Sequence, residues 1–128
     1  MANATAITLH KLDVETAKSD VTADVLDTGT DAVTLAFSPD GDMHNVLLRF
    51  ENTSSTKAMT VAVLAGDNAP AFLRSKGDVS ITVAESGTAY VVVDSARCKN
   101  ADGSVKVKST PATGQSQTLK ITAIQLPK

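Results

Sequence analysis

Apolar and polar residues alternate with a period of two along much of the chain. In segment 45–52 (NVLLRFEN), Val46, Leu48 and Phe50 fall on one side, and Leu47, Arg49 and Glu51 fall on the other. Successive side chains of a strand point to opposite faces, so this alternation predicts a strand with one buried face. The same pattern recurs in four further segments, at 57–65, 78–84, 104–109 and 117–126.

Four more segments have strand character with a less regular pattern. Residues 6–12, 21–28 and 32–38 are shorter or more mixed, and 21–28 is either a strand or an irregular connection. Segment 88–95 (TAYVVVDS) is apolar on both faces through Val91, Val92 and Val93. Strands buried on both faces read as continuous apolar runs. This segment therefore predicts a central strand, or a strand that a partner partly covers.

Turn residues separate these segments. SPDGD (38–42), NADGS (100–104) and PATGQ (111–115) hold the Pro, Asp and Gly that turns favour. The links 51–57 and 84–88 are short enough to predict hairpins between their flanking strands.

The number and spacing of these segments predict the fold class. Seven to nine short strands, without a long helical pattern, indicate an all-β, single-domain β-sandwich of jelly-roll or immunoglobulin-like type over residues 1–128. The chain holds three Phe, one Tyr and no Trp, so aliphatic side chains must fill the core. This thin core and the two-sided strand at 88–95 predict a homo-oligomer, most simply a trimer.

Charge and cysteine content exclude several classes of protein. A formal net charge of −2 with scattered basic residues argues against binding to nucleic acid or to an anionic membrane. A single cysteine, Cys98, cannot form an internal disulfide. The N-terminus has neither the basic nor the apolar region of a secretory signal, which predicts synthesis in a cytoplasm.

Candidate metal ligands are few. His10 and His44 are the two histidines, and neither has a second His or a Cys nearby in the sequence. Asp40 and Asp42 flank a glycine, and Glu51 stands at the twelfth position of a calcium loop that would begin at Asp40. However, the glycine is at the wrong position and strand residues occupy the centre of that loop. We expect a turn, with no metal and no cofactor.

Candidate nucleophiles and phosphate sites are equally weak. Cys98 lies between Arg97 and Lys99, which would lower the pKa of its thiol, but no base is close in sequence. Gly66 and Gly77 do not have the order of a phosphate-binding loop. We expect Cys98 to be structural and the protein not to be an enzyme.

Several short sequence segments between residues 46 and 107 follow one another in an order that resembles a known protein family. A strand ends in ENTS, the next runs into AGDN, and GDVSITVAESGT, YVVVDSAR and ADGSVKV follow. This order resembles the small β-sandwich head decoration (cement) proteins of tailed bacteriophages. The resemblance implies a structural virion protein that binds the outside of a capsid, often as a trimer, and stabilises it. It also implies contact with the major capsid protein, with no catalytic residue and no cofactor.

Two other functions remain open from the sequence. One is a different β-structural piece of a phage, such as a tail-tube, head-completion or fibre-base module. The other is a module that binds carbohydrate or a host surface, for which Tyr90 is the one available Tyr or Trp.

The connection 66–77 is the candidate contact with a partner. It is longer than a hairpin needs, and loops of such length are usually functional or disordered. An apolar anchor beside an arginine is typical of an interface hot spot. The alternative is that its apolar side chains cap the core, and residues 1–20 are a second candidate as an N-terminal arm. The partner-binding candidates are Pro70, Phe72, Leu73, Arg74 and Lys76.

Overall fold

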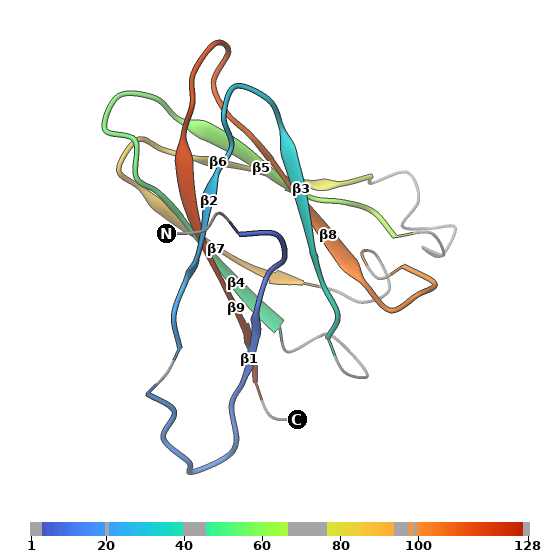
Figure 1. The fold of residues 1–128 in the computed structure, drawn as a ribbon. Coiled ribbons are helices and arrows are strands. Elements are labelled where there is room, and N and C mark those ends of the chain that lie inside the picture. Colours follow the sequence, from blue (N-terminus) through green and yellow to red (C-terminus); the bar gives the residue numbers. More distant parts are fainter. Residues whose placement is uncertain are drawn as a thin grey trace.

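The computed structural model describes residues 4–19, 21–39, 46–66, 77–93, 98 and 100–126. They form nine strands in two sheets packed face to face, a β-sandwich (Figure 1). Sheet A contains β1 (Leu9–Lys11), β2 (Asp24–Asp27), β4 (Val46–Asn52), β7 (Thr88–Val93) and β9 (Thr118–Gln125). Sheet B contains β3 (Val33–Phe37), β5 (Met59–Val63), β6 (Val79–Val83) and β8 (Val105–Thr110). The predicted all-β sandwich is confirmed, and each of the nine predicted segments contains a strand.

Strand pairing follows a nested order along the chain. β5 pairs with β6, β4 with β7, β3 with β8 and β2 with β9, all antiparallel. The chain is therefore a long antiparallel ribbon that folds over into two sheets, with strand orders β2-β9-β4-β7 and β3-β8-β5-β6. Of the two sandwich types that the sequence predicts, this is the order of the jelly roll.

β1 is an addition to this order. It pairs in parallel with the end of β9, from Leu9 opposite Ala123 to Lys11 opposite Gln125. β2 pairs antiparallel with the beginning of the same strand. The two short strands thus lie one after the other along a single edge of β9.

Most connections cross from one sheet to the other, which corrects two predictions. The links 51–57 and 84–88 are not hairpins, because β4 and β7 belong to sheet A whereas β5 and β6 belong to sheet B. Links of this length can form a hairpin within one sheet or a connection between two sheets. The pairing of β4 with β7 makes both of them connections between sheets. The turns at 28–32, 53–58, 84–87 and 111–117 lie together at one end of the sandwich (Figure 1).

The prediction of a central strand for 88–95 is also wrong. β7 is the last strand of sheet A, and its outward-facing Tyr90 and Val92 are 60% and 62% exposed. Its inward residues Val91 and Val93 do pack on the core. The continuous apolar run therefore reflects an edge strand with an exposed apolar face, so the alternative of a partner stays open.

The core lies between the sheets and follows the predicted alternation. Val46, Leu48 and Phe50 of β4 are fully buried, whereas the inward residues near the edges of the sheets, such as Ile81 of β6 and Val91 of β7, are partly buried. Aliphatic residues dominate this layer, since Phe37 and Phe50 are its two aromatic members in the described part of the chain. Its fully buried large side chains also include Leu26, Met59, Val61, Val63, Val83, Val105, Leu119 and Ile121.

Buried amides join the turns at the end where the crossing connections gather. Asn52 Nδ2 donates to the carbonyls of Lys57 (2.9 Å), Val83 (3.3 Å) and Ala84 (3.3 Å). Gln117 Nε2 donates to the same Lys57 carbonyl at 3.0 Å. Three connections between the sheets are thus tied by two side chains that are almost completely buried.

The N-terminal segment closes one lateral side of the sandwich. The Ala4 amide donates to the carbonyl of Val25 on β2 at 3.0 Å. The Ile7 amide donates to the carbonyl of Ala36 on β3 at 3.1 Å, and the Ile7 side chain is buried. Residues 4–7 therefore bridge the edge strands of the two sheets on that side.

Candidate interaction surface

The outward side of sheet A carries the most distinctive group of side chains, and those on β7 are exposed. Register aligns residues of β7, β4 and β9 in rows across this side. One row is Val92, Leu47 and Ile124, the next is Tyr90, Arg49 and Thr122, and the third is Thr88, Glu51 and Lys120. We call these nine residues the outer A face.

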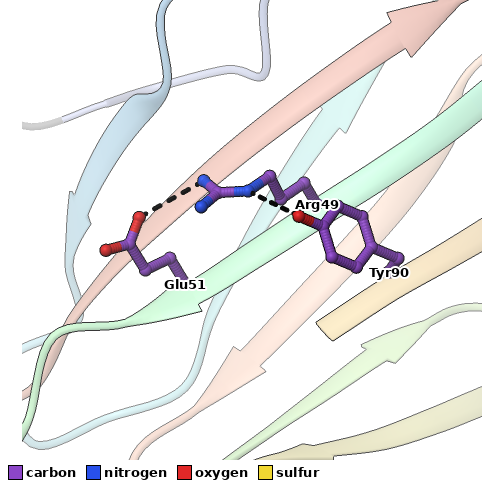
Figure 2. Close-up of polar contacts among 3 residues, drawn as sticks. All are labelled: Arg49, Glu51 and Tyr90. Carbon is purple, nitrogen blue, oxygen red and sulfur yellow. Dashed lines mark hydrogen bonds and ion pairs between the residues drawn. The ribbon is translucent and has the colours of Figure 1, made fainter. Parts of the chain in front are cut away.

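Arg49 occupies the centre of the outer A face (Figure 2). Its Nε donates to the Tyr90 hydroxyl at 3.3 Å, and one terminal nitrogen lies 3.2 Å from Oε2 of Glu51. The guanidinium carbon is 6.0 Å from the centre of the Tyr90 ring, at the limit of a cation–π contact. Arg49 is therefore held between an aromatic ring and a carboxylate, which fixes its position on the sheet.

Arginine is charged at any ordinary pH, and the contacts of Arg49 favour its charged form further. The hydrogen bond to Tyr90 raises the pKa of the guanidinium above its ordinary value, burial lowers that pKa by a smaller amount, and the bond to Glu51 raises it again. The side chains of Arg49 and Glu51 are each 35% exposed. Ion pairs so open to water contribute at most about 1 kcal/mol. The arrangement orients a cation at a surface and adds little to stability.

Apolar groups lie beside this polar centre. Val92 and Tyr90 are exposed, and Leu47 and Ile124 are half-buried in the same face. Single exposed apolar residues are ordinary, but a contiguous apolar group with a polar rim is typical of an interaction site.

Sheet B has a different outward side. Its outward residues are small or polar, with the two lysines Lys106 and Lys108 on β8. The others in these rows are Thr34, Ala36, Thr60, Ala62, Ser80, Thr82 and Thr110. The two outer sides of the sandwich are thus chemically unequal, and sheet A carries the exposed aromatic ring.

The predicted contact loop falls mostly outside the described residues. Its candidates Pro70, Phe72, Leu73, Arg74 and Lys76 all lie there, so their role stays a prediction. The described flanks show that the loop joins two neighbouring strands of sheet B, β5 and β6. The Ala65 amide donates to Oδ1 of Asp78 at 2.7 Å across its base.

The candidate metal ligands are not brought together within the described part of the chain. His10 is buried, with Nε2 3.0 Å from the carbonyl oxygen of Thr22. Glu51 forms an ion pair with Arg49. His44 and residues 40–42 lie outside the described residues. Among the described residues, no three acidic, His or Cys side chains form a group that could hold a metal ion.

Cys98 is a core residue. It is 1% exposed and belongs to the apolar cluster between the sheets, which agrees with a structural role. Its neighbours Arg97 and Lys99 lie outside the described residues.

The described residues include no helix that is long and apolar enough to span a membrane.

Sequence reasoning missed the pair formed by Arg49 and Tyr90. Each residue was placed on a strand, but they are 41 positions apart and meet only because β4 pairs with β7. The two-sided apolar pattern of 88–95 was the available signal, and one of its two interpretations was a strand that a partner partly covers.

Comparisons with protein-family models, with curated proteins and with solved structures find no match to this chain.

Proposed function

We propose that this chain is a non-enzymatic structural protein of a tailed-phage virion that binds the outside of the capsid and stabilises it. Its partner is the major capsid protein, and it acts as a homo-oligomer, since members of the family it resembles often form trimers. It is made in the host cytoplasm and ends on the capsid exterior.

The exposed outer A face is the observation that carries this proposal. Tyr90 and Val92 stand exposed beside Leu47 and Ile124, and Arg49 is held in place among them. Tyrosine and arginine are enriched among the residues that dominate binding energy at protein interfaces. A protein surface is the partner that matches a face of this composition.

The partner is inferred from the resemblance of residues 46–107 to phage head decoration proteins, which bind the major capsid protein. This part of the chain includes β4 to β7 and the first half of β8, so the resemblance covers the centre of the nested ribbon. A jelly roll alone does not indicate function, because the fold serves many unrelated roles.

A binding assay with expanded heads tests the proposal. The heads should come from the phage or prophage whose head genes accompany this chain, purified without it. We expect the protein to co-sediment with expanded heads until it saturates, and to bind unexpanded heads less. Failure to bind either form at micromolar protein would contradict the proposal.

A carbohydrate-binding module is the second candidate, and the exposure of Tyr90 favours it. An exposed aromatic ring beside a charged side chain is a platform on which a sugar can stack. Because the chain contains one Tyr and no Trp, its tyrosine emission reports on Tyr90 alone. A saturable change of this emission on titration with host-surface glycans would favour the module over the decoration protein. A tail or head-completion module would differ from a decoration protein in its low copy number in the particle.

A further inference from the structure

The free edge of β7 is a second feature of sheet A. On one side β7 pairs with β4, and no described strand pairs with its other side. An edge strand of this kind presents a row of unpaired backbone groups that another strand can join.

The register identifies which backbone groups face outward. The Asn52 amide donates to the Gly87 carbonyl at 3.0 Å, so these two residues form a hydrogen-bonded pair. Opposite residues of antiparallel strands alternate between hydrogen-bonded and non-hydrogen-bonded pairs. Ala89, Val91 and Val93 therefore direct their backbone groups to β4. Thr88, Tyr90 and Val92 direct theirs to the free edge.

This edge lacks the features that normally prevent pairing. Proteins protect exposed edges with charged residues, prolines, bulges or a covering segment. Residues 88–93 (TAYVVV) contain no charge and no proline, and their register with β4 runs without a bulge. On the opposite lateral side, residues 4–7 bridge the edges of β2 and β3. One side of the sandwich is covered, and the β7 side is uncovered among the described residues.

We propose that β7 pairs with β7 of a second copy of this chain, antiparallel and about a two-fold axis at Tyr90. In this register Tyr90 lies opposite its own copy, and Thr88 lies opposite Val92 of the second chain in both directions. All three residues whose backbone groups face the edge then form hydrogen-bonded pairs. Sheet A continues from one copy into the other.

A second copy fits this edge because the strand is complementary to itself. The facing side chains are uncharged, so no like charges lie directly opposite. An aromatic pair at the axis and β-branched pairs beside it are favourable cross-strand contacts. The charged Arg49 and Glu51 lie one strand away and are already paired with each other. The side chains of the outer A face stay on the surface, now continuous over two copies.

This dimer does not depend on the proposed capsid role. It also differs from the trimer of the resembling family, because a two-fold contact closes on itself with two copies.

Sedimentation of the purified protein tests the proposal, with Val92→Pro as the main variant. Proline removes an N–H that faces the free edge and leaves the ladder to β4 intact. We expect a dimer for the parent and for the control Val92→Thr, which keeps the N–H. Val92→Pro should weaken dimerisation by about tenfold or more, since the lost bond occurs twice. Tyr90→Lys, which sets two like charges at the axis, should do the same if proline disturbs the fold.

A cross-linking experiment tests the register. In a Cys98→Ala background, Tyr90→Cys places two thiols opposite each other at a distance that a disulfide can bridge. Oxidation should give a covalent dimer with Tyr90→Cys and none with Thr60→Cys, an exposed position on β5. A parent that sediments as a monomer, or as a trimer, at micromolar concentration overturns the proposal. Equal cross-linking of both variants overturns the register.

Discussion

Asn52 and Gln117 donate to the same backbone oxygen, the carbonyl of Lys57, at 2.9 and 3.0 Å. One amide comes from the end of β4 and the other from the turn before β9. Through this shared acceptor they join the connection between β4 and β5 to the connection between β8 and β9. The end of the sandwich where the chain crosses between sheets is therefore held by buried polar contacts.

Removing either amide should destabilise the protein. Asn52→Ala and Gln117→Ala each remove one of the two side-chain donors to the Lys57 carbonyl together with further buried hydrogen bonds, so each should lower the free energy of unfolding by about 1–3 kcal/mol. Each single variant leaves the Lys57 carbonyl one of these donors and the double variant leaves it neither, so the double variant should lose more than the sum of the two. Urea unfolding measures all three, with the exposed Thr60→Ala as a control within about 0.5 kcal/mol of the parent. Strict additivity would contradict a shared role.

Removing the side-chain hydroxyl of Ser109 should not destabilise the protein. Its side chain is fully buried on β8, and its hydroxyl has no hydrogen-bond partner among the described residues. Ser109→Ala removes an unsatisfied polar group, so it should leave stability unchanged or raise it by up to about 1 kcal/mol. Ser104→Ala is the matched control, because the Ser104 hydroxyl donates to Asp102 at 2.6 Å and its loss should destabilise. A clear loss of stability in Ser109→Ala would show that the hydroxyl does have a partner.

Asp102 should contribute to the acid dependence of stability. The hydroxyl and the amide of Ser104 both donate to its carboxylate, which lowers the pKa of Asp102 below its ordinary value. A lowered folded-state pKa stabilises the protein above the unfolded-state value, about 3.9, and this contribution is lost as pH falls through the folded pKa. Asp102→Asn and Ser104→Ala should both flatten the decline of stability in that range, measured by urea unfolding against pH. An unchanged slope in both would rule out this contribution.

Cys98 should be dispensable for binding. Cys98→Ser places a hydroxyl in the apolar cluster, so we expect a modest loss of stability and unchanged binding to expanded heads. Thermal unfolding and co-sedimentation measure the two effects separately. Loss of binding without loss of folding would assign this thiol a role beyond packing.

The alternation in β4 shows why the strands could be predicted. Which side of β4 is buried depends on local spacing, and Val46, Leu48 and Phe50 are buried as predicted. The pairing of β4 with β7 and β9 depends on residues far along the chain. The links 51–57 and 84–88 therefore resemble hairpins in sequence although each joins two sheets. The site could not be predicted from local sequence for the same reason, because Arg49 meets Tyr90 only through the pairing of β4 with β7.

The outer A face and the loop 66–77 are two candidates for the capsid contact, and double variants in each distinguish between them. Leu47→Thr with Ile124→Thr alters the apolar row of the outer A face without changing β7. Phe72→Ala with Arg74→Ala alters the loop candidate. If the outer A face is the contact, the first pair should weaken binding to expanded heads by about tenfold or more and the second should not. Lys106→Ala with Lys108→Ala, on the outward side of sheet B, should bind as the parent does.

Cryo-electron microscopy of expanded heads mixed with the purified protein tests the central claim most directly. We expect ordered additional density on the outer surface of the shell, at every equivalent lattice position, with the sandwich seated on the major capsid protein. Heads that stay bare at saturating protein, or density confined to the tail or the portal, would contradict a capsid decoration protein.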